Sequence, residues 1–149
     1  LWGAIPIKRG EADVEALKRG LDALAEGQIV VIAPEGTRSW DGKLQQALAG
    51  VVVMGLRSGA PLLPLVYYGG EQLKDNLRHF RRTDFYISVG RPFYLEPGDL
   101  KVDRQVRQLM LDEVMHQLAD LMPERYRGAY ADQLNPAQTY LRFCDSTRE

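Results

Sequence analysis

The sequence has a single cysteine, no long hydrophobic run and no excess of charge of either sign. One cysteine, Cys144, cannot form an internal disulfide and offers no second sulfur to a metal site, so a reducing, cytosolic environment is indicated. The 19 Lys and Arg residues and the 20 Asp and Glu residues leave a net charge of -1. Duplex nucleic acid attracts proteins with a positive excess, so we expect no nucleic-acid partner.

The longest apolar stretch, residues 51–65, is interrupted by Arg57, Gly59 and Pro61. A transmembrane helix needs about 20 mainly apolar residues, so this stretch is not expected to span a bilayer. With 149 residues, of which 45% are hydrophobic, the chain has the size of one domain. It begins with Leu1 and lacks the features of a signal peptide. We interpret it as a domain whose N-terminal part is missing.

The hydrophobic periodicity predicts three helices and three strands. Apolar residues recur at helical spacing before Gly27, before Gly59 and before Pro123, whereas shorter β-branched or alternating runs indicate strands. The expected helices cover residues 11–26, 43–58 and 102–122, and the expected strands cover residues 28–33, 62–68 and 84–90. This alternation favours an α/β sandwich with a mostly parallel sheet flanked by helices. Ligands of such sheets bind beyond the carboxyl ends of the strands, where residues 34–39 follow the first strand.

The sequence Pro-Glu-Gly-Thr-Arg-Ser at residues 34–39 contains the groups that bind a phosphate. Arg38 offers a planar fork of donors, and Thr37 and Ser39 add hydroxyl groups. Gly36 allows close approach of the backbone, and Glu35 could orient Arg38 or accept a hydroxyl from a substrate. The alternative is a solvated turn in which Glu35 and Arg38 only pair with each other.

Two further segments place this motif in a wider pattern. Gly-Ala-Ile-Pro-Ile-Lys-Arg-Gly occupies residues 3–10, and Gly-Ala-Pro-Leu-Leu-Pro-Leu occupies residues 59–65. In this order the three segments resemble three of the four sequence blocks of the glycerophospholipid acyltransferases of the lysophosphatidic acid acyltransferase type. The resemblance covers residues 1–130, interpreted as a partial, acceptor-binding acyltransferase domain, and leaves residues 131–149 as a C-terminal tail.

The resemblance implies transfer of a fatty acyl group from acyl-CoA or acyl-carrier protein to a hydroxyl of a glycerol phosphate or lysophospholipid in phospholipid biosynthesis. It implies no bound cofactor or metal. It also implies a location at the cytoplasmic face of the cell membrane, held peripherally or by a missing segment. The residues that would bind the acceptor phosphate are Arg9, Glu35, Gly36, Thr37, Arg38 and Ser39, and those that would line the pocket are Pro61 and Pro64.

The family's fourth block, H-x-x-x-x-D, supplies the general base and precedes the other three. Here only His79 and Asp84 match its spacing, and they follow residues 34–39, so we interpret them as a coincidental match. The chain alone is therefore expected to be inactive. A non-catalytic module that binds phosphate or lipid through Arg9 and Arg38 is the alternative. The family often has a lysine where Leu48 or Ala49 stands here, which leaves the acceptor headgroup open.

Overall fold

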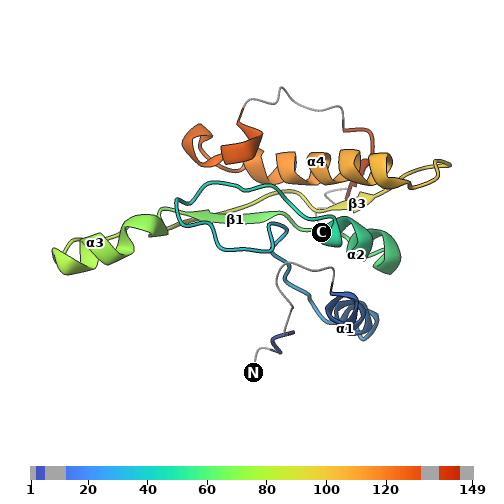
Figure 1. The fold of residues 1–149 in the computed structure, drawn as a ribbon, viewed down its shortest axis with the longest axis horizontal. Coiled ribbons are helices and arrows are strands. Elements are labelled where there is room, and N and C mark those ends of the chain that lie inside the picture. Colours follow the sequence, from blue (N-terminus) through green and yellow to red (C-terminus); the bar gives the residue numbers. More distant parts are fainter. Residues whose placement is uncertain (1–2, 6–12, 132–137, 145–149) are drawn as a thin grey trace, which may run out of the picture.

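The computed structural model describes residues 3–5, 13–131 and 138–144. Figure 1 shows α4 on one side of the strands and α1 on the other, with α2 next to α1. The helices are α1 (Val14–Ala25), α2 (Gly50–Ser58), α3 (Leu73–Arg78) and α4 (Arg104–Asp120), the strands are β1 (Leu65–Tyr68), β2 (Tyr86–Val89), β3 (Phe93–Leu95) and β4 (Leu141–Phe143), and short 3-10 turns are η1 (Gly70–Gln72), η2 (Glu124–Tyr126) and η3 (Gly128–Tyr130).

The described strands form two antiparallel pairs. β1 pairs with β2 from Leu65 opposite Val89 to Tyr68 opposite Tyr86. β3 pairs with β4, so residues 141–143 of the predicted tail belong to a sheet. The predicted sandwich with a mostly parallel sheet is therefore wrong.

The main error concerns residues 28–33, which have no regular secondary structure and belong to neither sheet. Their β-branched composition suggested a strand buried on both faces, yet Ile29 is 93% exposed and Val31 is 82% exposed. A strand exists only where a second strand accepts and donates its backbone hydrogen bonds, and no described segment does so here. The strand predicted over residues 28–33 is therefore wrong.

Of the helix predicted over residues 43–58, only α2 is helical, whereas residues 43–48 have no regular secondary structure. Leu44 explains the difference, because its N–H donates to the carbonyl of Tyr126 at 2.9 Å and its carbonyl accepts from Ala129 N–H at 3.0 Å. These long-range bonds replace the bonds that a helix would make. Glycine 59, with φ of +62°, ends α2 as predicted.

The core lies between α4, α2 and the β3–β4 pair. The predicted apolar stripe of α4 is confirmed, since Met110 is fully buried and Val114 is 5% exposed. Asp103 begins this helix by accepting the N–H of Val106 at 2.8 Å, a typical N-terminal cap. The largest fully buried side chains are Phe93, Met110, Leu111, Met115 and Val52.

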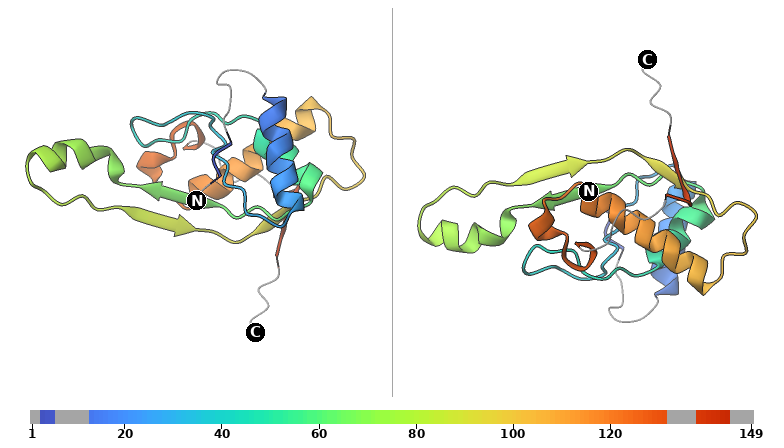
Figure 2. Two further views of the ribbon diagram at one scale, coloured as in Figure 1. Left: turned by 90° about the horizontal axis from the view of Figure 1, so that it is seen from below. Right: turned by 90° about the horizontal axis from the view of Figure 1, so that it is seen from above.

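The β1–β2 pair extends away from this core as an arm. α3 lies at its far end, as Figure 1 shows, and both views of Figure 2 agree. On one face of the arm, Leu65, Tyr67, Ile87 and Val89 are each more than half exposed, whereas Val66 on the opposite face is buried. The arm is therefore attached to the core by one face only.

Candidate functional site

Residues 34–48 form a loop that is closed at its neck. The N–H of Leu48 donates to the carbonyl of Pro34 at 2.8 Å, so the two ends lie side by side as in an Ω-loop. The bonds of Leu44 to Tyr126 and Ala129 attach the returning half of the loop to the turns after α4. The loop thus has a fixed base, from which residues 36–39 extend.

Glu35 stabilises this base from inside the loop. One carboxylate oxygen, Oε2, accepts the backbone N–H of Gln45 at 2.8 Å. Burial raises the pKa of Glu35, and the charge of Asp41 adds to this rise, whereas the bond from Gln45 opposes it. The carboxylate therefore spans the loop, and no ion pair joins it to Arg38 within the described chain.

Gly36 has a backbone conformation that side chains disfavour, with φ of +64°. Its N–H donates to the carbonyl of Ala33 at 3.1 Å, which forms a tight turn directly after residues 28–33. A Cβ atom at Gly36 would lie 2.9 Å from Cδ1 of Leu48. The turn therefore needs glycine for its backbone and brings the loop close to Leu48.

Thr37 and Arg38 are both exposed at the end of this turn. Within the part of the chain that the structure describes, neither side chain makes a hydrogen bond or an ion pair. The guanidinium and the Thr37 hydroxyl are therefore accessible to a ligand. This pair is the strongest candidate for an anion site that the loop offers.

Ser39 differs from its two neighbours, because its hydroxyl donates to Oδ1 of Asp41 at 3.0 Å. The same oxygen accepts the N–H of Lys43 at 3.1 Å. These two bonds, that from Lys43 first, lower the pKa of Asp41. Of the two hydroxyl groups predicted to bind phosphate, that of Ser39 is thus hydrogen-bonded to the Asp41 carboxylate, which also places negative charge nearby.

Sequence reasoning did not assign Gln45, Asp41 or Tyr130 to the site. The Tyr130 hydroxyl oxygen accepts the N–H of Ala47 at 3.3 Å, and burial raises the pKa of this tyrosine. The Ser-x-Asp spacing at residues 39–41 could have indicated the hydrogen bond from Ser39 to Asp41. Tyr130 ends the sequence Arg-Tyr-Arg-Gly-Ala-Tyr at residues 125–130, but nothing in that pattern indicates that Tyr130 supports the loop.

The other predicted binding residues lie apart or outside the described structure. Arg9 is outside the described residues. Pro61 is exposed, whereas Pro64 is buried and its carbonyl accepts the N–H of Gly90 at 2.9 Å. The proline segment is thus bonded to residues 90–93, and no hydrogen bond between described residues connects it with residues 34–39.

His79, at the end of α3, has its ring nitrogen Nδ1 2.7 Å from the carbonyl of Asp75. This bond requires a proton on Nδ1, and the described residues show no hydrogen bond from the ring to Asp84. His116 is buried in the core with its ring against Tyr130.

The described residues contain no cluster of three or more metal-ligating side chains, and none of the described helices combines the length and apolarity of a membrane span.

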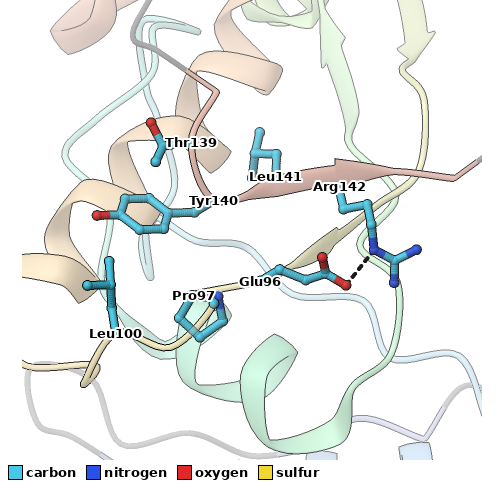
Figure 3. Close-up of a pocket in the computed structure, with 8 residues that line it drawn as sticks. Glu96, Pro97, Leu100, Thr139, Tyr140, Leu141 and Arg142 are labelled. Carbon is cyan, nitrogen blue, oxygen red and sulfur yellow. Dashed lines mark hydrogen bonds and ion pairs between the residues drawn. The ribbon is translucent and has the colours of Figure 1, made fainter.

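Figure 3 shows a pocket of about 230 Å³ beside the β3–β4 pair. Arg142 forms an ion pair with Glu96 at its edge and lies over the ring of Tyr94, 4.8 Å from the ring centre. A second hollow of about 450 Å³ lies between α1 and α2. Neither includes a residue of 34–39.

Comparison with known proteins shows a similarity to acyltransferases. Residues 1–68 match the family model named Acyltransferase. A chloroplastic 1-acyl-sn-glycerol-3-phosphate acyltransferase of Brassica napus is 29% identical over 110 residues, which are 69% of this chain and 31% of the relative. The enzyme of that name from Bacillus subtilis is 32% identical over 92 residues, or 61% of this chain and 43% of the relative.

A second chloroplastic relative, from Arabidopsis thaliana, is 34% identical over 71 residues, which are 46% of this chain and 20% of the relative. No solved structure matches the chain. The chain spans less than half the length of each of these relatives. The resemblance seen in the motifs is confirmed: the chain is similar in sequence to 1-acyl-sn-glycerol-3-phosphate acyltransferases of plants and bacteria.

Proposed function

We propose that residues 34–39 hold the phosphate of a glycerol-phosphate or lysophospholipid acceptor. The parent enzyme transfers a fatty acyl group to that acceptor from acyl-CoA or acyl-carrier protein, at the cytoplasmic face of the membrane. The observation that carries the proposal is the pair Thr37 and Arg38, exposed and unbonded among the described residues on a loop with a fixed base. Residues 1–130 form the acceptor-binding part, and residues 131–149, which follow it, include the strand β4.

The chemistry of the loop suits a phosphate monoester. A guanidinium donates two parallel N–H bonds to phosphate oxygens, and the Thr37 hydroxyl adds a third donor. The Ser39 hydroxyl already donates its hydrogen bond to Asp41. The positive charge comes from Arg38, with Arg9 as the second cation. Glu35 holds the loop in shape through Gln45. In this proposal, Pro61 and Pro64 remain the residues that would line the pocket.

The chain does not supply the general base in this proposal. Its two histidines are His79, which is exposed and bonded to Asp75, and His116, which is buried in the core. Neither follows the family order, in which the histidine precedes the glutamate of the motif. The chain by itself is therefore expected to transfer no acyl group from acyl-CoA to 1-acylglycerol 3-phosphate. Transfer that disappears in His79→Ala would contradict this assignment.

The direct test is calorimetric binding of a short-chain 1-acylglycerol 3-phosphate below its critical micelle concentration. Arg38→Ala is expected to weaken binding by about tenfold or more, because charge-assisted hydrogen bonds are lost. The matched control is Arg104→Ala, which removes an exposed arginine from the first turn of α4. The corresponding 1-acylglycerol without phosphate should not bind. Equal affinity of the chain and Arg38→Ala for the phosphate would overturn the proposal.

A further inference from the structure

The end of the arm exposes an unusual group of apolar side chains. Leu73 is 55% exposed, Leu77 is 71% exposed and Phe80 is 99% exposed. Leu73 and Leu77 are four residues apart in α3, so they share one face of the helix. α3 lies away from the core in all three views of Figures 1 and 2. These side chains therefore contribute nothing to the core.

Phe80 has a backbone conformation usually reserved for glycine, with φ of +51°. It follows the C-terminal end of α3 in a Schellman motif, in which Arg81 N–H donates to the Asn76 carbonyl at 2.8 Å and Phe80 N–H donates to the Leu77 carbonyl at 3.3 Å. The amide of Asn76 also donates to the Thr83 hydroxyl at 3.1 Å. A fully exposed phenylalanine in this position costs stability that glycine would avoid, without any packing to offset it.

Cations surround these apolar side chains. Residues 73–82 contain four cations and one carboxylate, a net charge of +3 in a chain whose net charge is -1. Neither ion pair among the described residues involves this segment. The cations are Lys74, Arg78, Arg81 and Arg82, all exposed, and the carboxylate is Asp75. Exposed apolar side chains among unpaired cations complement the headgroups and the acyl boundary of an anionic bilayer.

We propose that the arm end, residues 73–82, is the element that docks on an anionic phospholipid surface, with Phe80, Leu77 and Leu73 entering the headgroup region. This inference rests on the proposed function, because an acceptor with a fatty acyl chain is obtained from a membrane. The backbone strain implied by the positive φ of Phe80 is then offset when the aromatic ring, presented at the end of α3, enters the bilayer. The cations contact lipid phosphates beside it.

The test is co-sedimentation of the chain with vesicles of 70% phosphatidylcholine and 30% phosphatidylglycerol, without any lysophospholipid. Phe80→Gly removes the ring and also relieves the left-handed backbone, so it should unfold at the same or higher denaturant concentration. Its vesicle partitioning should nevertheless fall about tenfold. The control Ile29→Ala, at a side chain that is 93% exposed elsewhere, should leave partitioning unchanged. Arg81→Glu with Arg82→Glu should reduce partitioning about a hundredfold.

Several outcomes would overturn the docking proposal. They are no partitioning of the chain, equal partitioning of Phe80→Gly, and equal binding to vesicles of phosphatidylcholine alone. A Phe80→Gly variant that changes from dimer to monomer in sedimentation while keeping its vesicle binding would assign the surface to a second copy. Binding of the short-chain acceptor reports separately on Arg38 and should be unaffected in Phe80→Gly, so failure of one proposal is distinguishable from failure of the other.

Discussion

Substitution of Gly36 tests whether the backbone of the candidate loop positions Thr37 and Arg38. With φ of +64°, any other L-residue except asparagine or aspartate is disfavoured by about 1–2 kcal/mol. A Cβ would also meet Cδ1 of Leu48 at 2.9 Å, but that atom ends a flexible side chain that is 62% exposed and can rotate away. The backbone cost should therefore dominate. Gly36→Ala is expected to lower the free energy of unfolding by about 1–2 kcal/mol, and Gly36→Asn by less.

Urea unfolding gives these free energies, and calorimetry with the short-chain acceptor gives the matching loss of affinity. The control is Leu48→Ala, alone and combined with Gly36→Ala. If the backbone dominates, the coupling between the two substitutions stays below about 0.5 kcal/mol. Complete rescue of Gly36→Ala by Leu48→Ala, or equal damage from asparagine and alanine, would refute the reasoning, because the steric contact would then be decisive.

Two further predictions concern the buried carboxyl group of Glu113 and the partly buried one of Glu35. Glu113→Ala should lower the free energy of urea unfolding by about 3 kcal/mol, because this 4%-exposed carboxylate accepts the N–H groups of Thr139 and Tyr140, both at 2.9 Å. The exposed control Glu15→Ala should cost about 0.5 kcal/mol or less, and similar losses in both variants would contradict the prediction. Burial raises the pKa of Glu35, so its contribution to stability is complete below the ordinary value of 4.5 and is lost as pH rises through the folded-state value. The stability of Glu35→Gln relative to the unsubstituted chain should thus increase from pH 4.5 upward in urea unfolding, and a pH-independent difference would argue against it.

The helix α4 shows what local pattern predicts well. Its apolar residues recur every four positions, and burial of Met110 and Val114 confirms the stripe. The pattern did not predict burial of Glu113 and His116 on the same helix. Glu113 is buried because residues 139–140 pack over that side and donate backbone N–H groups to it. Such a partner is 26 residues away in sequence, so periodicity within the helix contains no trace of it.

In the candidate site, too, residue types can be read from the sequence, whereas their bonding partners cannot. The order of three sequence segments showed the resemblance, and residue types within 34–39 indicated donors for a phosphate, because donor chemistry is a property of the side chains themselves. The partners of Glu35 and Ser39 became visible only in the folded chain, where a backbone N–H and a neighbouring carboxylate engage them. Hydrogen-bond partners depend on which groups folding brings within about 3 Å, not on residue type.

The sequence by itself determined the resemblance to the acyltransferases, the main helices, the end of α2 at Gly59 and the side-chain types present in residues 34–39. Only the tertiary structure decided that the sheets are two antiparallel pairs, that residues 28–33 remain unpaired and that α3 lies at the end of an arm. The physical reason is that helices and turns are stabilised by bonds within a few residues, whereas strand pairing and exposure depend on contacts between distant segments.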